Sequence, residues 1–190
     1  MNHPEILLVP AFMFADYFLT LAGAIQRGRK YEEHFKIEHY EMNPVWQKAV
    51  KERRWINPRH ILLTAALTVL LVLLAESTPA PDPLIPGLLG ALLVLFGMVI
   101  GRHISNLMIF TYMSRNPEGI TGQVTMTHGM TLAIAFFANF ILLPPLILIA
   151  LFAPHPFTIG GLCGAVMLIA IHLGWMWRHK RRAVKAVSGP

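Results

Sequence analysis

The chain has 190 residues, of which 55% are hydrophobic and only 14% are charged, whereas roughly a quarter of the residues of a typical soluble domain are charged. The net charge of +6 would suit a nucleic-acid partner only if it lay on one face of a soluble domain, and here it lies in loops between apolar runs. The single cysteine excludes an intrachain disulfide and a CxxC metal or redox motif. The composition therefore predicts an all-α integral membrane protein, with residues 1–190 forming one membrane domain.

Five apolar runs are long enough to cross a bilayer, which takes about 20 residues of helix. The third and fourth exceed the thickness of the hydrocarbon layer and require tilt or extension beyond it. No basic segment precedes the first run, so we interpret it as a span and not as a signal peptide. The predicted transmembrane helices are residues 5–26, 60–76, 84–112, 126–153 and 157–177.

Lys and Arg alternate between the loops that join these spans. Nine lie in the segment 27–59 and five in the tail that begins at Arg178, while the loop 113–125 holds Arg115. The loops 76–83 and 153–156 hold neither Lys nor Arg. Cytoplasmic loops carry the excess of basic residues, so we expect an external N-terminus and a cytoplasmic C-terminus, in the inner membrane of a prokaryote.

The basic segment 27–59 contains the sequence NPVWQKAVKERRW, which begins at Asn43–Pro44. Asn is a good N-cap and Pro suits the first helical position, so a short helix is predicted here. Its Trp46 and Trp55, with Lys and Arg between them, favour an interfacial amphipathic helix at anionic headgroups; a docking site for an acidic partner is the alternative. Asn57–Pro58 and Asn116–Pro117 are also interpreted as helix caps.

Several polar side chains are expected at membrane depth. Asp16 lies about ten residues, roughly 15 Å, from the basic end of its span, and Arg102 and His103 lie at nearly the same depth of the third span. Asn106 follows Arg102 by four residues and His103 by three, so the three share one helix face. Thr20 is one turn from Asp16. We predict a polar cavity open to the cytoplasm, with Asp16 facing the interior and having Arg102 or His103 as its nearest partner.

Three interpretations of this cluster remain open. Asp16 and Arg102 could form a buried ion pair, with Thr20 and Asn106 as interhelical hydrogen bonds. Asp16 and His103 could instead bind a cation or exchange protons near neutral pH, because burial raises the pKa of a carboxylate and lowers that of a His. Finally, a divalent metal could bind oxygen and imidazole ligands, although no H-x-x-x-H or H-E-x-x-H spacing is present. The four metal-ligand candidates are Asp16, His103, His128 and His172.

The last two spans contain no charged residue over 119–177. Pro144–Pro145 is expected to kink the fourth span, because proline frees a carbonyl from its helical partner. Asn139, one turn earlier, either bonds such a carbonyl or lines a cavity opened by the kink. Small residues on the fifth span allow close helix approach, including self-association; they are Gly160, Gly161, Gly164 and Ala165.

The pattern Asp16-x-x-x-Thr20, followed by Glu41-x-Asn43-Pro44, resembles a family of small prokaryotic membrane proteins of unknown function. These proteins share an Asp and a Thr in the first span and Glu-x-Asn-Pro soon after it. The resemblance covers the first quarter of the chain. It implies that Asp16 and Glu41 belong to one site, and it implies no particular activity.

The sequence favours a small transport-type protein that handles a cation, a proton or a small polar solute. An accessory or scaffold subunit of a membrane complex is the second hypothesis, and an intramembrane enzyme acting on a lipid headgroup is the third. No G-x-S-x-G motif or P-loop lysine supports the familiar enzyme classes. A homo-oligomer or a partner membrane subunit is expected, and no cofactor is assigned beyond the metal hypothesis. The candidate substrate or ion-binding residues are Asp16, Thr20, Glu41, Arg102, His103, Asn106 and Asn139.

Overall fold

The computed structural model describes residues 3–29, 31–37, 40–79 and 82–187, with side chains described up to Arg181. Three of the basic residues counted above, Lys30, Arg182 and Lys185, lie outside the described side chains.

Within the described residues, five helical segments are long and apolar enough to cross a membrane. Their ends lie within a few residues of the predicted boundaries, so the all-α architecture and the number of long apolar segments are confirmed. The segments are Pro4–Arg27, Pro58–Ser77, Leu84–Arg115, His128–Phe152 and Pro156–Arg181.

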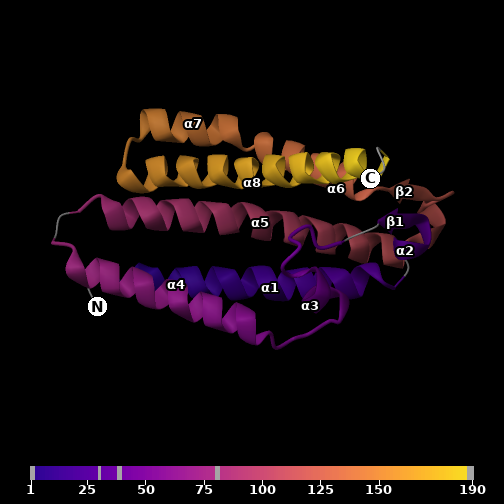
Figure 1. Ribbon diagram of the computed structural model, residues 1–190, viewed down its shortest axis with the longest axis horizontal. Helices are drawn as coiled ribbons and strands as arrows, with labels where there is room; N and C mark the ends of the chain where they lie inside the picture. The colour runs from indigo at the N-terminus through magenta and orange to yellow at the C-terminus, as the bar shows by residue number, and fades with distance from the viewer. Residues whose placement is uncertain (1–2, 30, 38–39, 80–81, 188–190) are drawn as a thin grey trace.

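The long helices lie side by side along the longest axis of the molecule (Figure 1). Helix α5 packs between α1 and α8; α4 lies beside α1, and α6 and α7 pack on α8. A 3₁₀ helix, η1 (Pro4–Leu7), leads into α1. The bounds are α1 (Leu8–Arg27), α4 (Pro58–Ser77), α5 (Leu84–Arg115), α6 (His128–Phe140), α7 (Leu143–Phe152) and α8 (Pro156–Val187).

Short elements gather at one end of the bundle, which we call the loop end (Figure 1). Strands β1 (Phe35–Ile37) and β2 (Val124–Met126) pair in parallel there and join two segments far apart in the sequence. The sequence did not predict this pairing, because a three-residue strand is too short to show a periodic pattern. The remaining short elements are α2 (Tyr31–His34), α3 (Gln47–Lys51) and the 3₁₀ helix η2 (Pro117–Gly119).

Small residues let α5 and α8 approach closely. A Cβ atom added to Gly160 would overlap the backbone of Gly87, and one added to Gly164 would overlap the backbone of Ala91. On the other side, a Cβ atom at Gly90 would overlap the backbone of Phe157. The small residues expected to permit close approach on the fifth span are therefore used for packing within the chain.

The fourth span is broken into two helices. Helix α6 ends at Phe140 and α7 begins at Leu143, with prolines in its first turn. Proline is tolerated at that position because the first N–H groups of a helix have no intrahelical partner. The kink expected at Pro144–Pro145 is thus a helix break just before these residues.

Two of the three Asn-Pro pairs cap a helix through the Asn side chain, at opposite ends of their helices. The Asn57 Oδ1 atom accepts hydrogen bonds from the backbone N–H groups of Arg59 and His60, at 3.2 and 3.4 Å, at the start of α4. At the end of α5, the Asn116 side-chain amide instead donates to the Tyr112 carbonyl at 2.8 Å. Asn116 is therefore the C-cap of α5.

The predicted amphipathic helix is shorter than expected and packs on the protein. Asn43 accepts a hydrogen bond from Val45 N–H at 3.1 Å within a turn, and α3 begins only at Gln47. The Trp46 ring lies edge-on to His60, with the ring centroids 5.6 Å apart. Trp46 therefore contacts the bundle, whereas Trp55 is exposed as an interfacial residue would be.

Candidate functional site

Three neighbouring cavities open among the described residues, and they share walls. The inner cavity, of about 280 Å³, lies between α1, α5 and α8. Its charged, His, Thr and Asn lining residues are Asp16, Thr20, Glu41, Asn43, His60, Arg102, His103 and His172.

Two larger cavities flank the inner one. The basic cavity, of about 770 Å³, lies between α1, β1 and α3, and its charged lining residues are Arg27, Glu32, Glu41, Lys48, Lys51, Glu52 and Arg53. The lateral cavity, of about 700 Å³, lies between α5 and α6, and its polar lining includes Tyr40, Arg102, Ser105, Asn106 and Asn139. Glu41 lines both the basic and inner cavities, and Arg102 lines both the inner and lateral cavities.

In the inner cavity, Asp16 contacts His103. The Asp16 Oδ1 atom lies 3.1 Å from His103 Nε2, and the exposed fraction of the side chain is 26% for Asp16 and 9% for His103. Helices α1 and α5 supply the two groups at matching depth, as the count of residues from the basic end predicts. Asp16 thus faces the protein, with His103 as a titratable neighbour.

Thr20 determines which nitrogen of His103 carries a proton. Its hydroxyl donates to the Asp16 backbone carbonyl at 2.9 Å, so its oxygen accepts from His103 Nε2–H at 3.0 Å. The other ring nitrogen, Nδ1, is buried and has no hydrogen-bond partner among the described residues. His103 is therefore tied to α1 through Nε2 alone.

Arg102 bonds to α8 and forms no ion pair with Asp16 in the described part of the chain. The His172 Nδ1–H group donates to the Leu168 carbonyl at 2.9 Å, which leaves Nε2 as an acceptor. The Arg102 Nη1 atom lies 3.2 Å from that nitrogen and donates to it. Of the two partners considered for Asp16, the structure places His103 in contact.

Glu41 enters the inner cavity from the segment after β1. Its Oε1 atom accepts a hydrogen bond from the Asn43 backbone N–H at 2.7 Å. Burial, with a smaller contribution from Asp16, raises the pKa of Glu41, against the opposing effects of the Asn43 N–H, His103 and Arg102. Asp16 and Glu41 thus line one cavity, together with Thr20 and Asn43.

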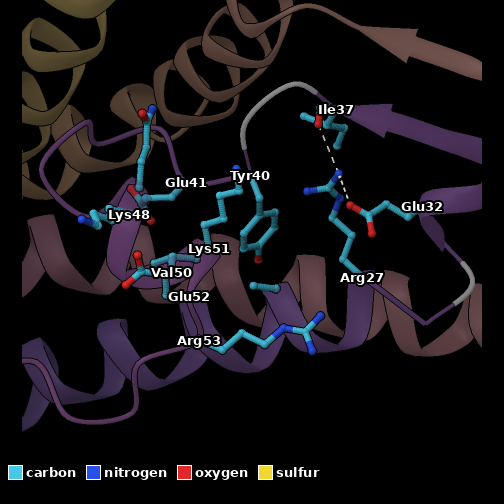
Figure 2. A pocket seen from close by; sticks show the side chains of 12 residues that line it. Arg27, Glu32, Ile37, Tyr40, Glu41, Lys48, Val50, Lys51, Glu52 and Arg53 are labelled. Carbon is cyan, nitrogen blue, oxygen red and sulfur yellow. Dashed lines mark hydrogen bonds and ion pairs between the residues drawn. The ribbon is translucent and has the colours of Figure 1, made fainter.

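The basic cavity is centred on Arg27, which is 8% exposed. Figure 2 shows Arg27 pointing toward Ile37 and Glu32; its Nη2 atom donates to the Ile37 carbonyl at 3.2 Å and to Glu32 Oε1 at 2.8 Å. The guanidinium carbon lies 5.8 Å from the centroid of the Tyr40 ring. Burial raises the pKa of Tyr40, so its hydroxyl stays neutral at physiological pH. Of the four cationic side chains that line this cavity, Arg27 is therefore paired with a carboxylate.

The sequence-based interpretation placed Asn106 and Asn139 with Asp16, but these amides line the lateral cavity. Asn139 is only 2% exposed, and its Nδ2 atom lacks a hydrogen-bond partner within the described chain. Of the two roles expected for Asn139, its position matches lining a cavity. Asn106 follows His103 by three residues, and such residues differ by about 60° in direction around the helix axis. Asn106 is therefore turned away from His103.

The four proposed metal ligands do not converge. Asp16, His103 and His172 line the inner cavity, but His128 starts α6 and lies against His179, with the ring centroids 5.4 Å apart. No group of three or more His, Cys, Asp or Glu residues in the described chain is arranged to hold a metal ion. His128 is separated from the other three because it is the first residue of α6.

His60 is a lining residue that the sequence analysis missed. It is 6% exposed and stacks on Tyr17 with the ring centroids 4.7 Å apart. Its Nε2 atom finds no hydrogen-bond partner in the described residues. The available signal was its position in the first turn after the Asn57–Pro58 cap, which lies at the basic end of the second span.

Comparisons of the chain with protein-family models, curated proteins and solved structures found no match. The likeness of Asp16, Thr20, Glu41 and Asn43 to a family of small membrane proteins gains no support from them. The chemistry of the three cavities is therefore what bears on function.

Proposed function

We propose that this chain is a small transport-type protein of the prokaryotic inner membrane that moves protons or small cations through the inner cavity. One observation carries the proposal: Asp16, Glu41 and His103 line a single cavity among apolar helices. Placing an ionisable group in such apolar surroundings costs several kcal/mol, and such groups commonly mark an ion or proton pathway.

The connection between cavities supports a route to the surface. Glu41 lines both the inner and the basic cavity, so one carboxyl group reaches both spaces. Its raised pKa brings proton exchange closer to neutral pH than for an ordinary Glu. A proton could pass from the basic cavity to Glu41 and on to the Asp16–His103 pair.

The charge distribution supports the orientation of this route. With the basic segments on the cytoplasmic side, the N-terminus is outside, the C-terminus is inside, and all five helices cross the membrane. The loop end and the basic cavity then face the cytoplasm. The inner cavity opens in the same direction.

A flux measurement tests the proposal. Purified protein is reconstituted into liposomes that contain a pH-sensitive dye, and an imposed K⁺ gradient with valinomycin drives proton movement. We expect Asp16→Asn to abolish the flux of the wild-type protein, while Glu76→Gln, a change of an exposed carboxylate on α4, leaves it intact. Equal proton and cation flux in the wild type and Asp16→Asn would overturn the proposal.

An accessory subunit is the second candidate, and α7 favours it. This helix has no buried residue, so its surface is available to lipid or to another membrane protein. Purification in mild detergent discriminates between the two functions: a stoichiometric partner protein supports the accessory role, whereas a homo-oligomer supports the transporter.

A further inference from the structure

We propose that the lateral cavity binds one lipid of the surrounding bilayer through an anionic phosphate headgroup. This inference goes beyond proton or cation movement, and it rests on a different cavity. Its basis is the combination of one cationic side chain, one unsatisfied amide donor and apolar walls that open toward the membrane.

The size and walls of the cavity suit part of an amphiphile. Its volume of about 700 Å³ lies within the roughly 300–1,000 Å³ usual for ligand sites. Most of the wall is apolar and includes Met98, Phe110, Ile134 and Leu142. Such a wall favours hydrocarbon over water.

The polar groups of the cavity suit an anion. Arg102 is the one charged residue among the described residues that line it. Its Nη1 atom bonds to His172, and a guanidinium has five N–H donors in all, so others remain for a ligand. An Arg next to amide donors is well matched to phosphate oxygens, which form charge-assisted hydrogen bonds with both.

Asn139 supplies the second, independent observation. The residue is 2% exposed and lines the cavity, and its side-chain Nδ2 donor lacks a partner within the described residues. A buried donor left unsatisfied costs about 1–3 kcal/mol. A headgroup oxygen bound beside Arg102 would remove this cost.

The cavity is accessible from the membrane side of the bundle. Gly101 and Ser105 on α5, and Ile134 and Ala138 on α6, line it and are exposed. Helix α6 packs on α8, which leaves the wall between α5 and α6 open. The lining also includes Tyr31 and Met126 at the loop end, so a headgroup can reach Arg102 from that end while the lipid chains leave between α5 and α6.

Lipid binding to the purified protein in detergent tests the headgroup. Native mass spectrometry would compare phosphatidic acid with diacylglycerol of the same chains, with inorganic phosphate as a competitor. Because the phosphate adds at least one charge-assisted hydrogen bond, we expect phosphatidic acid to bind at least about tenfold more tightly than diacylglycerol. Equal affinity of the two lipids would overturn the proposal, and so would displacement of phosphatidic acid by an equimolar amount of inorganic phosphate.

Variants test the location. We expect Ala138→Phe, which fills the cavity from an exposed wall position, and Asn139→Leu, which removes the unsatisfied donor, to weaken phosphatidic acid binding. Ala66→Phe on α4, an exposed position outside the three cavities, should leave it unchanged. If Ala138→Phe does not purify, Ser105→Phe blocks the opposite wall.

Unchanged binding in the cavity variants would overturn the assignment. A dimeric wild type that becomes monomeric in Ala138→Phe would also overturn it, because a second copy of the chain would then occupy the cavity.

Discussion

Asp16 lies in an apolar helix beside two polar neighbours, and its buried Oδ1 atom has no hydrogen-bond partner in the described part of the chain. His103 Nε2 lies 3.1 Å from its carboxylate, and Thr20 fixes the orientation of that ring by accepting its N–H. Arg102, at almost the same depth, bonds to His172. Residue counting along α1 and α5 predicted matching depths for Asp16, Arg102 and His103, but it could not predict the rotation of each side chain about its helix axis.

The contact between Asp16 and His103 predicts energetic coupling. Asp16→Asn and His103→Gln should each lower the free energy of unfolding by about 1–3 kcal/mol, because each changes one side of a contact between buried polar groups. The double variant should lose less than the sum, since contacting residues are not additive. Thermal denaturation in detergent measures the stability of the two single variants and of the double variant. As a control, the stability effects of Asp16→Asn and of Thr158→Ala, near the opposite end of the bundle, should add. If the effects of Asp16→Asn and His103→Gln also add, the contact between these residues contributes nothing to stability.

Glu41 predicts a dependence of stability on pH. Its pKa is 4.5 in an ordinary environment and is raised in the folded protein. Folding thus favours the protonated form of Glu41. This contributes about 1.4 kcal/mol to folding stability for each unit by which the pKa is raised. The contribution is present below pH 4.5 and is lost as the pH rises through the pKa of the folded state. As the pH rises from 4.5 through the folded-state pKa, the melting temperature of Glu41→Gln should fall less than that of the wild type. Glu33→Gln, at an exposed carboxylate, serves as the control, and a curve for Glu41→Gln parallel to the wild type would contradict the prediction.

At the scale of elements, the contact between α5 and α8 depends on glycine. Gly164 faces the backbone of Ala91 so closely that a methyl group has no room. Gly174, on the same helix, has open space around it. The two positions therefore form a matched pair for substitution.

We expect Gly164→Ala to destabilise the protein by about 1–3 kcal/mol, because the two helix backbones must move apart. Gly174→Ala should leave stability unchanged or raise it by up to about 1 kcal/mol, since Ala is the better helix former. Thermal denaturation of both variants in the same detergent measures the difference. Equal melting temperatures would mean that α5 and α8 do not cross at Gly164.

The long helices could be predicted because hydropathy is a local property of the sequence. The helix break before Pro144 was also foreseeable, since proline acts on its own neighbourhood. The β1–β2 pairing and the short form of α3 could not be predicted in this way. They depend on contacts between distant residues, such as Trp46 with His60.

At the scale of the whole molecule, the arrangement of charges predicts which loops face the cytoplasm. In a Cys163→Ser background, Glu76→Cys and Glu118→Cys place one thiol each at opposite ends of the bundle. A membrane-impermeant maleimide added to intact cells, with the outer membrane opened if there is one, should label position 76 but not position 118. Lysis should make both reactive. Labelling of position 118 in intact cells would reverse the orientation and place the basic cavity outside.

The parallel pairing of β1 with β2 sets an order of assembly. His34, next to β1, bonds to the carbonyl of Gly122, 88 residues later in the chain. During synthesis, both α4 and α5 must be made before Ile37 can pair with Met126 in β2. Closing so long a loop is entropically costly, so this pairing is delayed relative to local helix formation. The wall of the lateral cavity to which Ile37 and Met126 both contribute is therefore completed only after α1, α4 and α5 have been made.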